Sequence, residues 1–79
     1  MALTSAQLEL VKTIIRKYLN GSTAVEFIMD CNECSNAEID VFDELCRDPQ
    51  RTALGDRLWI KVKYSVLNEA YEITAGEYR

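Results

Sequence analysis

Residues 58–78, LWIKVKYSVLNEAYEITAGEY, carry the clearest strand pattern in the chain. Apolar and polar side chains alternate through its first half, with Leu58, Ile60, Val62, Tyr64 and Val66 set against Arg57, Trp59, Lys61, Lys63 and Ser65. A period of two is typical of a β-strand with one buried face. A second run, AYEITAGEY, follows after a short interval, so we expect an antiparallel β-hairpin at the end of the chain.

Asn68 and Glu69 lie between the two runs and are the expected turn. A turn at this place would pair Val66 with Tyr71, Tyr64 with Ile73, Val62 with Ala75, and Trp59 with Tyr78. Asn68 suits a type I′ turn, although Glu69 stands where Gly is preferred. The alternative is one long helix over residues 49–73, which would make the protein a small all-α bundle.

Residues 4–21, TSAQLELVKTIIRKYLNG, predict a helix over about residues 5–19. Thr4 and Gln7 have the spacing of a capping box, and Gly21 can end the helix in a left-handed conformation. At about 100° per residue, one arc of the helix collects the apolar side chains of Leu8, Val11, Ile14, Ile15, Tyr18 and Leu19.

Residues 22–31, STAVEFIMDC, fit two structures. As a helix, the segment has Thr23 and Glu26 as a capping box. As a strand, it places Val25, Phe27 and Met29 on one face and Glu26, Ile28 and Asp30 on the other. We favour the helix here, while the strand remains open.

Residues 35–49, SNAEIDVFDELCRDP, predict a clearer helix, in which Ser35 and Glu38 form a capping box and Pro49 ends the segment. The expected fold is therefore α+β, a single small globular domain over residues 1–79 with two or three N-terminal helices packed on a C-terminal antiparallel β-hairpin. The expected core consists of Val11, Ile15, Tyr18, Ile39, Phe42, Leu45, Ile60, Val62, Tyr64 and Ile73.

Length and composition exclude most enzyme classes. A chain of 79 residues buries only about 60% of its unfolded surface, which leaves little room for a deep substrate cleft. It contains no histidine, the commonest general base and the commonest neutral metal ligand. We expect a non-enzymatic protein without a cofactor. The N-terminal segment lacks the apolar core of a signal peptide, so we also expect a cytoplasmic protein with no membrane partner.

Cys31, Cys34 and Cys46 are the only residues in a pattern that suggests metal or redox chemistry. A structural zinc site needs four ligands, and one cysteine pair with a lone third cysteine falls short of that number. The order strand, CxxC, helix would resemble thioredoxin-like folds over a short segment. The carboxylates of Asp30 and Glu33 disfavour the thiolate that such chemistry needs. We expect no metal and no redox role.

Negative charge is concentrated in the middle of the chain. Residues 24–48 contain eight acidic side chains against the single base Arg47, a net charge of −7 in a chain whose total is −4. We expect a binding module whose acidic surface, residues 30–48, docks on a basic partner surface. The expected contact residues are Asp40, Asp43 and Glu44 at the centre and Asp30, Glu33, Glu38 and Asp48 at the rim.

In size and charge the chain is similar to small phage-encoded acidic inhibitors, including anti-CRISPR and other DNA-mimic proteins. That likeness implies an inhibitor that blocks the nucleic-acid site of its partner, itself a nucleic-acid-binding protein. The simpler alternative is a solvated acidic face that only keeps the protein in solution.

A competing hypothesis uses the opposite charge. On the strand model, Arg57, Trp59, Lys61 and Lys63 project from one face, as in sheets that bind single-stranded nucleic acid. A winged-helix-like regulatory protein, with helices at 23–31 and 36–47 before the hairpin, is a related alternative. Its recognition helix would be acidic and would repel phosphates, so we do not expect direct nucleic-acid binding. Homodimerisation through an uncovered hairpin edge also remains open.

Overall fold

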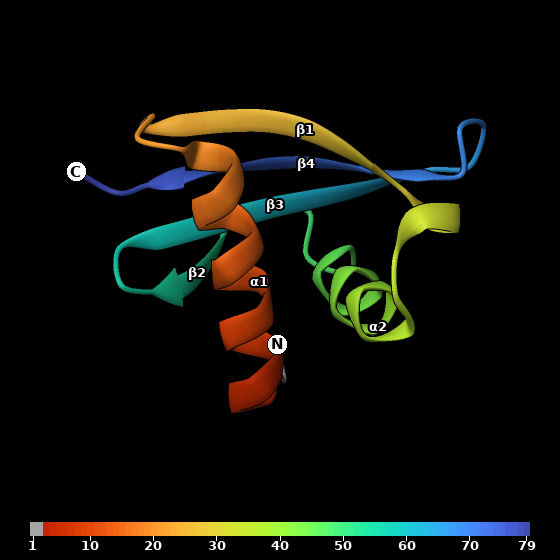
Figure 1. Ribbon diagram of the computed structural model, residues 1–79, viewed down its shortest axis with the longest axis horizontal. Helices are drawn as coiled ribbons and strands as arrows, with labels where there is room; N and C mark the ends of the chain where they lie inside the picture. Colours follow the sequence, from red (N-terminus) through yellow and green to blue (C-terminus); the bar gives the residue numbers. More distant parts are fainter. Residues whose placement is uncertain (1–2) are drawn as a thin grey trace.

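The computed structural model describes residues 3–79 and forms a four-stranded sheet with two α-helices. In chain order the elements are α1 (Ser5–Leu19), β1 (Ala24–Asp30), the 3₁₀ turn η1 (Cys31–Glu33), α2 (Asn36–Leu45), β2 (Thr52–Gly55), β3 (Leu58–Ser65) and β4 (Ala70–Glu77). The strands are antiparallel in the order β1-β4-β3-β2, and both helices pack on one face of the sheet (Figure 1). The predicted α+β class is confirmed. Within residues 3–79, no helix is long and apolar enough to cross a membrane.

The predicted C-terminal hairpin is present as β3 and β4, but its register differs from the expected one by two residues. Tyr64 pairs with Tyr71, and Trp59 pairs with Gly76. The loop spans residues 66–69, because Glu69 adopts a left-handed backbone (φ 48°) and its N–H donates to the carbonyl of Val66 at 3.4 Å. A shift of two residues keeps the side chains of the paired residues on their expected faces. The all-α alternative is wrong.

The helix favoured for residues 22–31 is also wrong, since residues 24–30 form the edge strand β1. This strand pairs with β4 from Ala24 opposite Gly76 to Asp30 opposite Ala70. Its half-buried side chains are Val25, Phe27 and Met29, and its exposed ones are Glu26, Ile28 and Asp30. Pairing with a distant strand overrides the local capping signal. The winged-helix arrangement requires a helix over residues 23–31, so the structure does not contain that arrangement.

β2 was not expected, because its four residues lie in a stretch that reads as an irregular connection. Thr52 pairs with Ile60, and a bulge follows between Ala53 and Gly55. Asp56 and Arg57 then adopt positive φ angles of 53° and 66°. Two successive residues of this kind are characteristic of a type I′ turn, which therefore joins β2 to β3 rather than β3 to β4.

The core lies between the sheet and the two helices. Of the predicted core residues, those that are buried are Val11, Ile15, Phe42, Leu45, Ile60, Val62 and Ile73, with Ile39 half-buried. Tyr18 and Tyr64 are 40% and 41% exposed, so their assignment to the core is wrong. Tyr71 is buried instead, with its ring centroid 5.3 Å from those of Phe42 and Tyr64.

Candidate protein-docking surface

α2 carries the central acidic stripe. Asp40, Asp43 and Glu44 stand at positions i, i+3 and i+4, which lie on one side of a helix. The opposite side is buried through Val41, Phe42 and Leu45. The capping box of Ser35 and Glu38 fixes the start of the helix, as the sequence predicted. The stripe therefore points away from the core on a firmly anchored element.

Asp43 is held in place from the sheet. The hydroxyl of Tyr71 donates a hydrogen bond of 2.6 Å to the Asp43 carboxylate. Burial, and then this hydrogen bond, raise the pKa of Tyr71, so the phenol remains a donor throughout the physiological range. Glu44 lies 3.4 Å from Arg47 in an ion pair on the helix surface.

The rim carboxylates cap backbone groups. The carboxylates of Asp30, Glu38 and Asp48 accept the backbone N–H groups of Asn32 (2.8 Å), Ser35 (2.8 Å) and Gln50 (3.0 Å). Glu33 is exposed on η1. The structure thus groups Asp30 with Glu33 where β1 meets η1, and places Asp48 beyond the far end of α2.

Internal ion pairs leave most of this charge uncompensated. Between residues 3 and 79, the ion pair of Arg47 with Glu44 is the only one that involves an acidic residue of the segment 30–48. The other basic partners are Lys12 and Arg16, which contact Asp56 at 3.1 and 3.0 Å. The negative charge of the middle segment therefore remains available to a partner.

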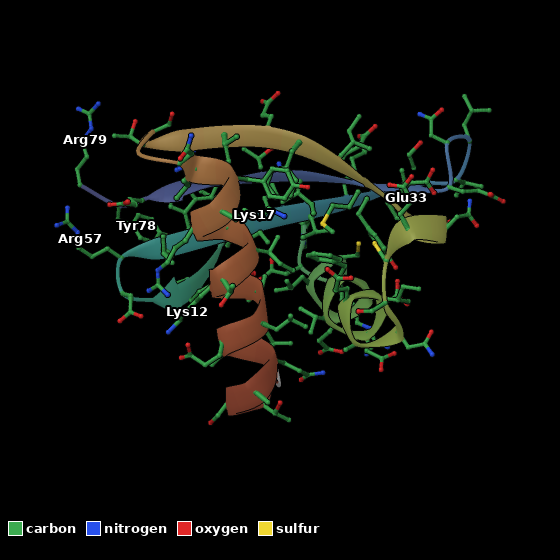
Figure 2. The ribbon with its side chains drawn as sticks, viewed as in Figure 1. Lys12, Lys17, Glu33, Arg57, Tyr78 and Arg79 are labelled. Atoms are coloured by element: carbon green, nitrogen blue, oxygen red, sulfur yellow. The ribbon has the colours of Figure 1, made fainter. Side chains whose placement is uncertain are left out.

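The molecule is electrically polar along its length. Figure 2 shows Glu33 at one end and Arg57 and Arg79 at the other. The longest dimension is 34 Å, several times the Debye length of about 8 Å at physiological ionic strength. Salt therefore screens Arg57 and Arg79 at the far end from the carboxylates around η1.

The loop between β3 and β4 adds an apolar element that the sequence pattern did not reveal. Val66 and Leu67 are 79% and 92% exposed at its tip. The backbone of Glu69 ties this loop to η1, because its carbonyl accepts the N–H of Cys31 at 3.0 Å. The alternation pattern instead predicts Val66 on the inward face of a longer strand. The sign of this apolar tip in the sequence is the adjacent pair Val66 and Leu67 just before the expected turn.

The alternative nucleic-acid surface has its aromatic residue covered by internal contacts, while its basic residues are exposed. Trp59 is only 5% exposed, because the guanidinium of Arg51 lies 3.9 Å above its ring. A Cβ at Gly76 would stand 2.8 Å from the same ring, so only glycine allows this close packing. Arg57 donates to the carbonyl of Tyr78 at 2.9 and 3.2 Å. Arg57, Lys61 and Lys63 are exposed as expected, so Trp59 is the member of the predicted set that is covered.

The cysteines lie near one another around η1 and α2 and form no disulfide. The order strand, CxxC, helix does occur, as β1, Cys31 to Cys34, and α2. Burial, and then the charge of Glu38, raise the pKa of Cys34; burial, and then Asp43, raise that of Cys46. A raised pKa disfavours the reactive thiolate. Within residues 3–79, no three His, Cys, Asp or Glu side chains are grouped so that they could hold a metal ion.

Comparison with known proteins does not point to a function. No protein-family model, no curated protein and no solved structure matches this chain. The acidic stripe, its rim and the apolar loop are therefore the features from which a function has to be inferred.

Proposed function

We propose that the protein is a non-enzymatic binding module that docks on a basic protein surface. The docking surface is the acidic end, defined as Asp30, Glu33, Glu38, Asp40, Asp43, Glu44 and Asp48. The observation that carries the proposal is that, among residues 3–79, only Glu44 of this set has an ion-pair partner. Several of these carboxylates are held by hydrogen bonds from backbone N–H groups or from the Tyr71 hydroxyl, so they are preorganised acceptors for Arg and Lys.

The spacing of the charges favours a partner whose basic residues normally hold phosphates. Neighbours at i, i+3 and i+4 on a helix are about 5–6 Å apart. A row of negative charges at this spacing can occupy the Lys and Arg side chains of a nucleic-acid site, which otherwise neutralise a dense line of phosphates. The proposed role is inhibition of a nucleic-acid-binding protein by occupation of its site.

A charge-neutralised variant tests the proposal. The test variant combines Asp40→Asn, Asp43→Asn and Glu44→Gln, and the control combines Glu9→Gln, Glu72→Gln and Glu77→Gln on exposed positions elsewhere. Both raise the net charge equally. A basic protein captured from the host extract by the wild type, then purified, should bind the test variant about tenfold or more weakly, since each lost charge-assisted bond is worth about 1 kcal/mol or more.

Calorimetric titration of both variants against that purified protein is the measurement. The control should retain wild-type affinity, and thermal unfolding should show that both variants fold. Equal affinity of the test variant and the wild type, or an equal loss in the two variants, would refute docking through α2.

A further inference from the structure

The sheet has two edges, and only β1 is suited to accept another strand. β2, at one edge, has four residues and a bulge between Ala53 and Gly55, features that discourage pairing with further strands. β1, at the other edge, has seven residues in continuous register with β4, without proline or bulge. In Figure 1 it forms the outer margin of the sheet.

Alternate residues of β1 direct their backbone polar groups away from the sheet. The carbonyl of Thr23 accepts from Glu77, and the N–H of Cys31 donates to Glu69, each at 3.0 Å. Hydrogen bonding alternates along an antiparallel pair. The backbone N–H and C=O groups of the odd-numbered residues between these two therefore point toward β4. The residues whose N–H and C=O groups point outward are Ala24, Glu26, Ile28 and Asp30. Within residues 3–79, no strand pairs with them.

Apolar surface flanks this row of free backbone groups on both sides. Ile28 is 65% exposed on the uncovered face of the sheet. On the helix side, the ring of Tyr18 stacks on Phe27 with centroids 3.9 Å apart and remains partly exposed. A hollow of about 200 Å³ at this edge is lined by Tyr18, Ile28, Met29, Asp30, Glu33 and Cys34. An added strand would cover both apolar groups.

Charge selects the kind of strand that fits. On the uncovered face, an added strand would set its side chains beside Glu26 and Asp30, while Glu33 lines the hollow. Basic side chains at those positions are favourable. A second copy of β1 would bring the same carboxylates near each other across the seam, where like charges destabilise the pairing. The edge therefore favours a basic extended segment over self-association.

We propose that the free edge of β1 receives an extended segment of the basic partner as a fifth strand, with alternating basic and apolar residues. This inference rests on the proposed function, because the same acidic end supplies the charge. Main-chain hydrogen bonds would supply affinity, and alternate side chains beside Glu26, Ile28 and Asp30 would supply specificity.

Two synthetic peptides and two edge variants test strand addition. One probe alternates Lys and Val; the other has the same composition with all Lys before all Val. Ile28→Pro removes an outward N–H without breaking the ladder to β4, and Ile28→Ala keeps that N–H but removes most of the side chain. Affinity and amide hydrogen exchange of the labelled protein are measured with each peptide.

We expect the alternating peptide to slow exchange at positions 24, 26, 28 and 30 and to bind Ile28→Pro about tenfold or more weakly than Ile28→Ala. Should Ile28→Pro fail to fold, Glu26→Lys serves instead, and it should weaken the Lys-Val peptide while favouring a Glu-Val one. Binding that protects α2 but leaves the four edge amides unprotected would overturn strand addition and leave the docking surface intact.

Two other outcomes are also decisive. Failure of both peptides to bind would overturn the strand site, whereas docking through α2 is decided separately by the charge-neutralised variant. In the absence of peptide, protection of the edge amides that grows with protein concentration would assign the edge to a second copy of the chain. That result would overturn the proposal that a basic segment occupies it.

Discussion

Tyr71 connects the buried core of the sheet to the acidic stripe. Its ring packs against Phe42 and Tyr64, and its hydroxyl reaches Asp43 at 2.6 Å. Tyrosine combines a large apolar body with one polar atom that needs a partner when buried. The sequence pattern selected Tyr18 and Tyr64 for the core, because periodicity identifies a face but not the depth of each position on it.

We expect Tyr71→Phe to lower the free energy of unfolding by about 1 kcal/mol, the usual net value of one hydrogen bond. Tyr18→Phe is the matched control, since the Tyr18 ring is partly exposed and contributes a stack with Phe27 that phenylalanine preserves. Urea unfolding of both variants is the measurement. Equal stability of Tyr71→Phe and the wild type would mean that the contact to Asp43 contributes nothing.

At the scale of elements, local signals predicted the helices and the C-terminal hairpin, but not the two edge strands. The capping boxes at Thr4 and Ser35 are both present, because capping depends on residues three positions apart. β1 pairs with β4 far along the chain, so propensity over a short window could not assign it. β2 pairs with the adjacent β3 but has only four residues, too few to show a clear alternation. The faces of β1 did follow from alternation once its partner strand was known.

A charged contact joins α1 to the turn between β2 and β3. Lys12 and Arg16 donate to one Asp56 oxygen at 3.1 and 3.0 Å. The hydrogen bond and charge of Lys12, followed by the hydrogen bond of Arg16, lower the pKa of Asp56. A carboxyl whose pKa is lowered by folding stabilises the protein above its unfolded pKa of about 3.9 and loses that contribution as pH falls through the folded pKa.

We therefore expect the stability of Asp56→Asn to fall less steeply than that of the wild type as the pH becomes acidic. The fold should change little. Asn tolerates the left-handed backbone at this position (φ 53°), so the substitution removes charge without adding strain. Thermal unfolding of both proteins from neutral pH to about pH 3 is the measurement. An unchanged acid limb in the variant would contradict the assignment, and high salt should reduce the difference between the proteins.

In the whole molecule, the acidic residues of the middle segment could be identified from the sequence, but only part of their arrangement could. The i, i+3, i+4 spacing of Asp40, Asp43 and Glu44 predicted one helix face. That Asp30 and Asp48 cap backbone groups, and that Val66 and Leu67 emerge beside η1, follows from turns whose geometry no periodicity encodes. Trp59 is covered by Arg51, which lies eight positions earlier, just before β2, and alternation within β3 could not reveal that contact.

The proposed docking surface requires negative potential to be concentrated around α2 and η1. Relaxation of each backbone amide by soluble cationic and anionic nitroxide radicals measures the local potential directly, without any partner. We expect amides of α2 and η1 to be relaxed more strongly by the cationic radical, and those near Arg57 and Arg79 more strongly by the anionic one. A ratio that stays uniform along the chain, or α2 amides that favour the anionic radical, would contradict the claim.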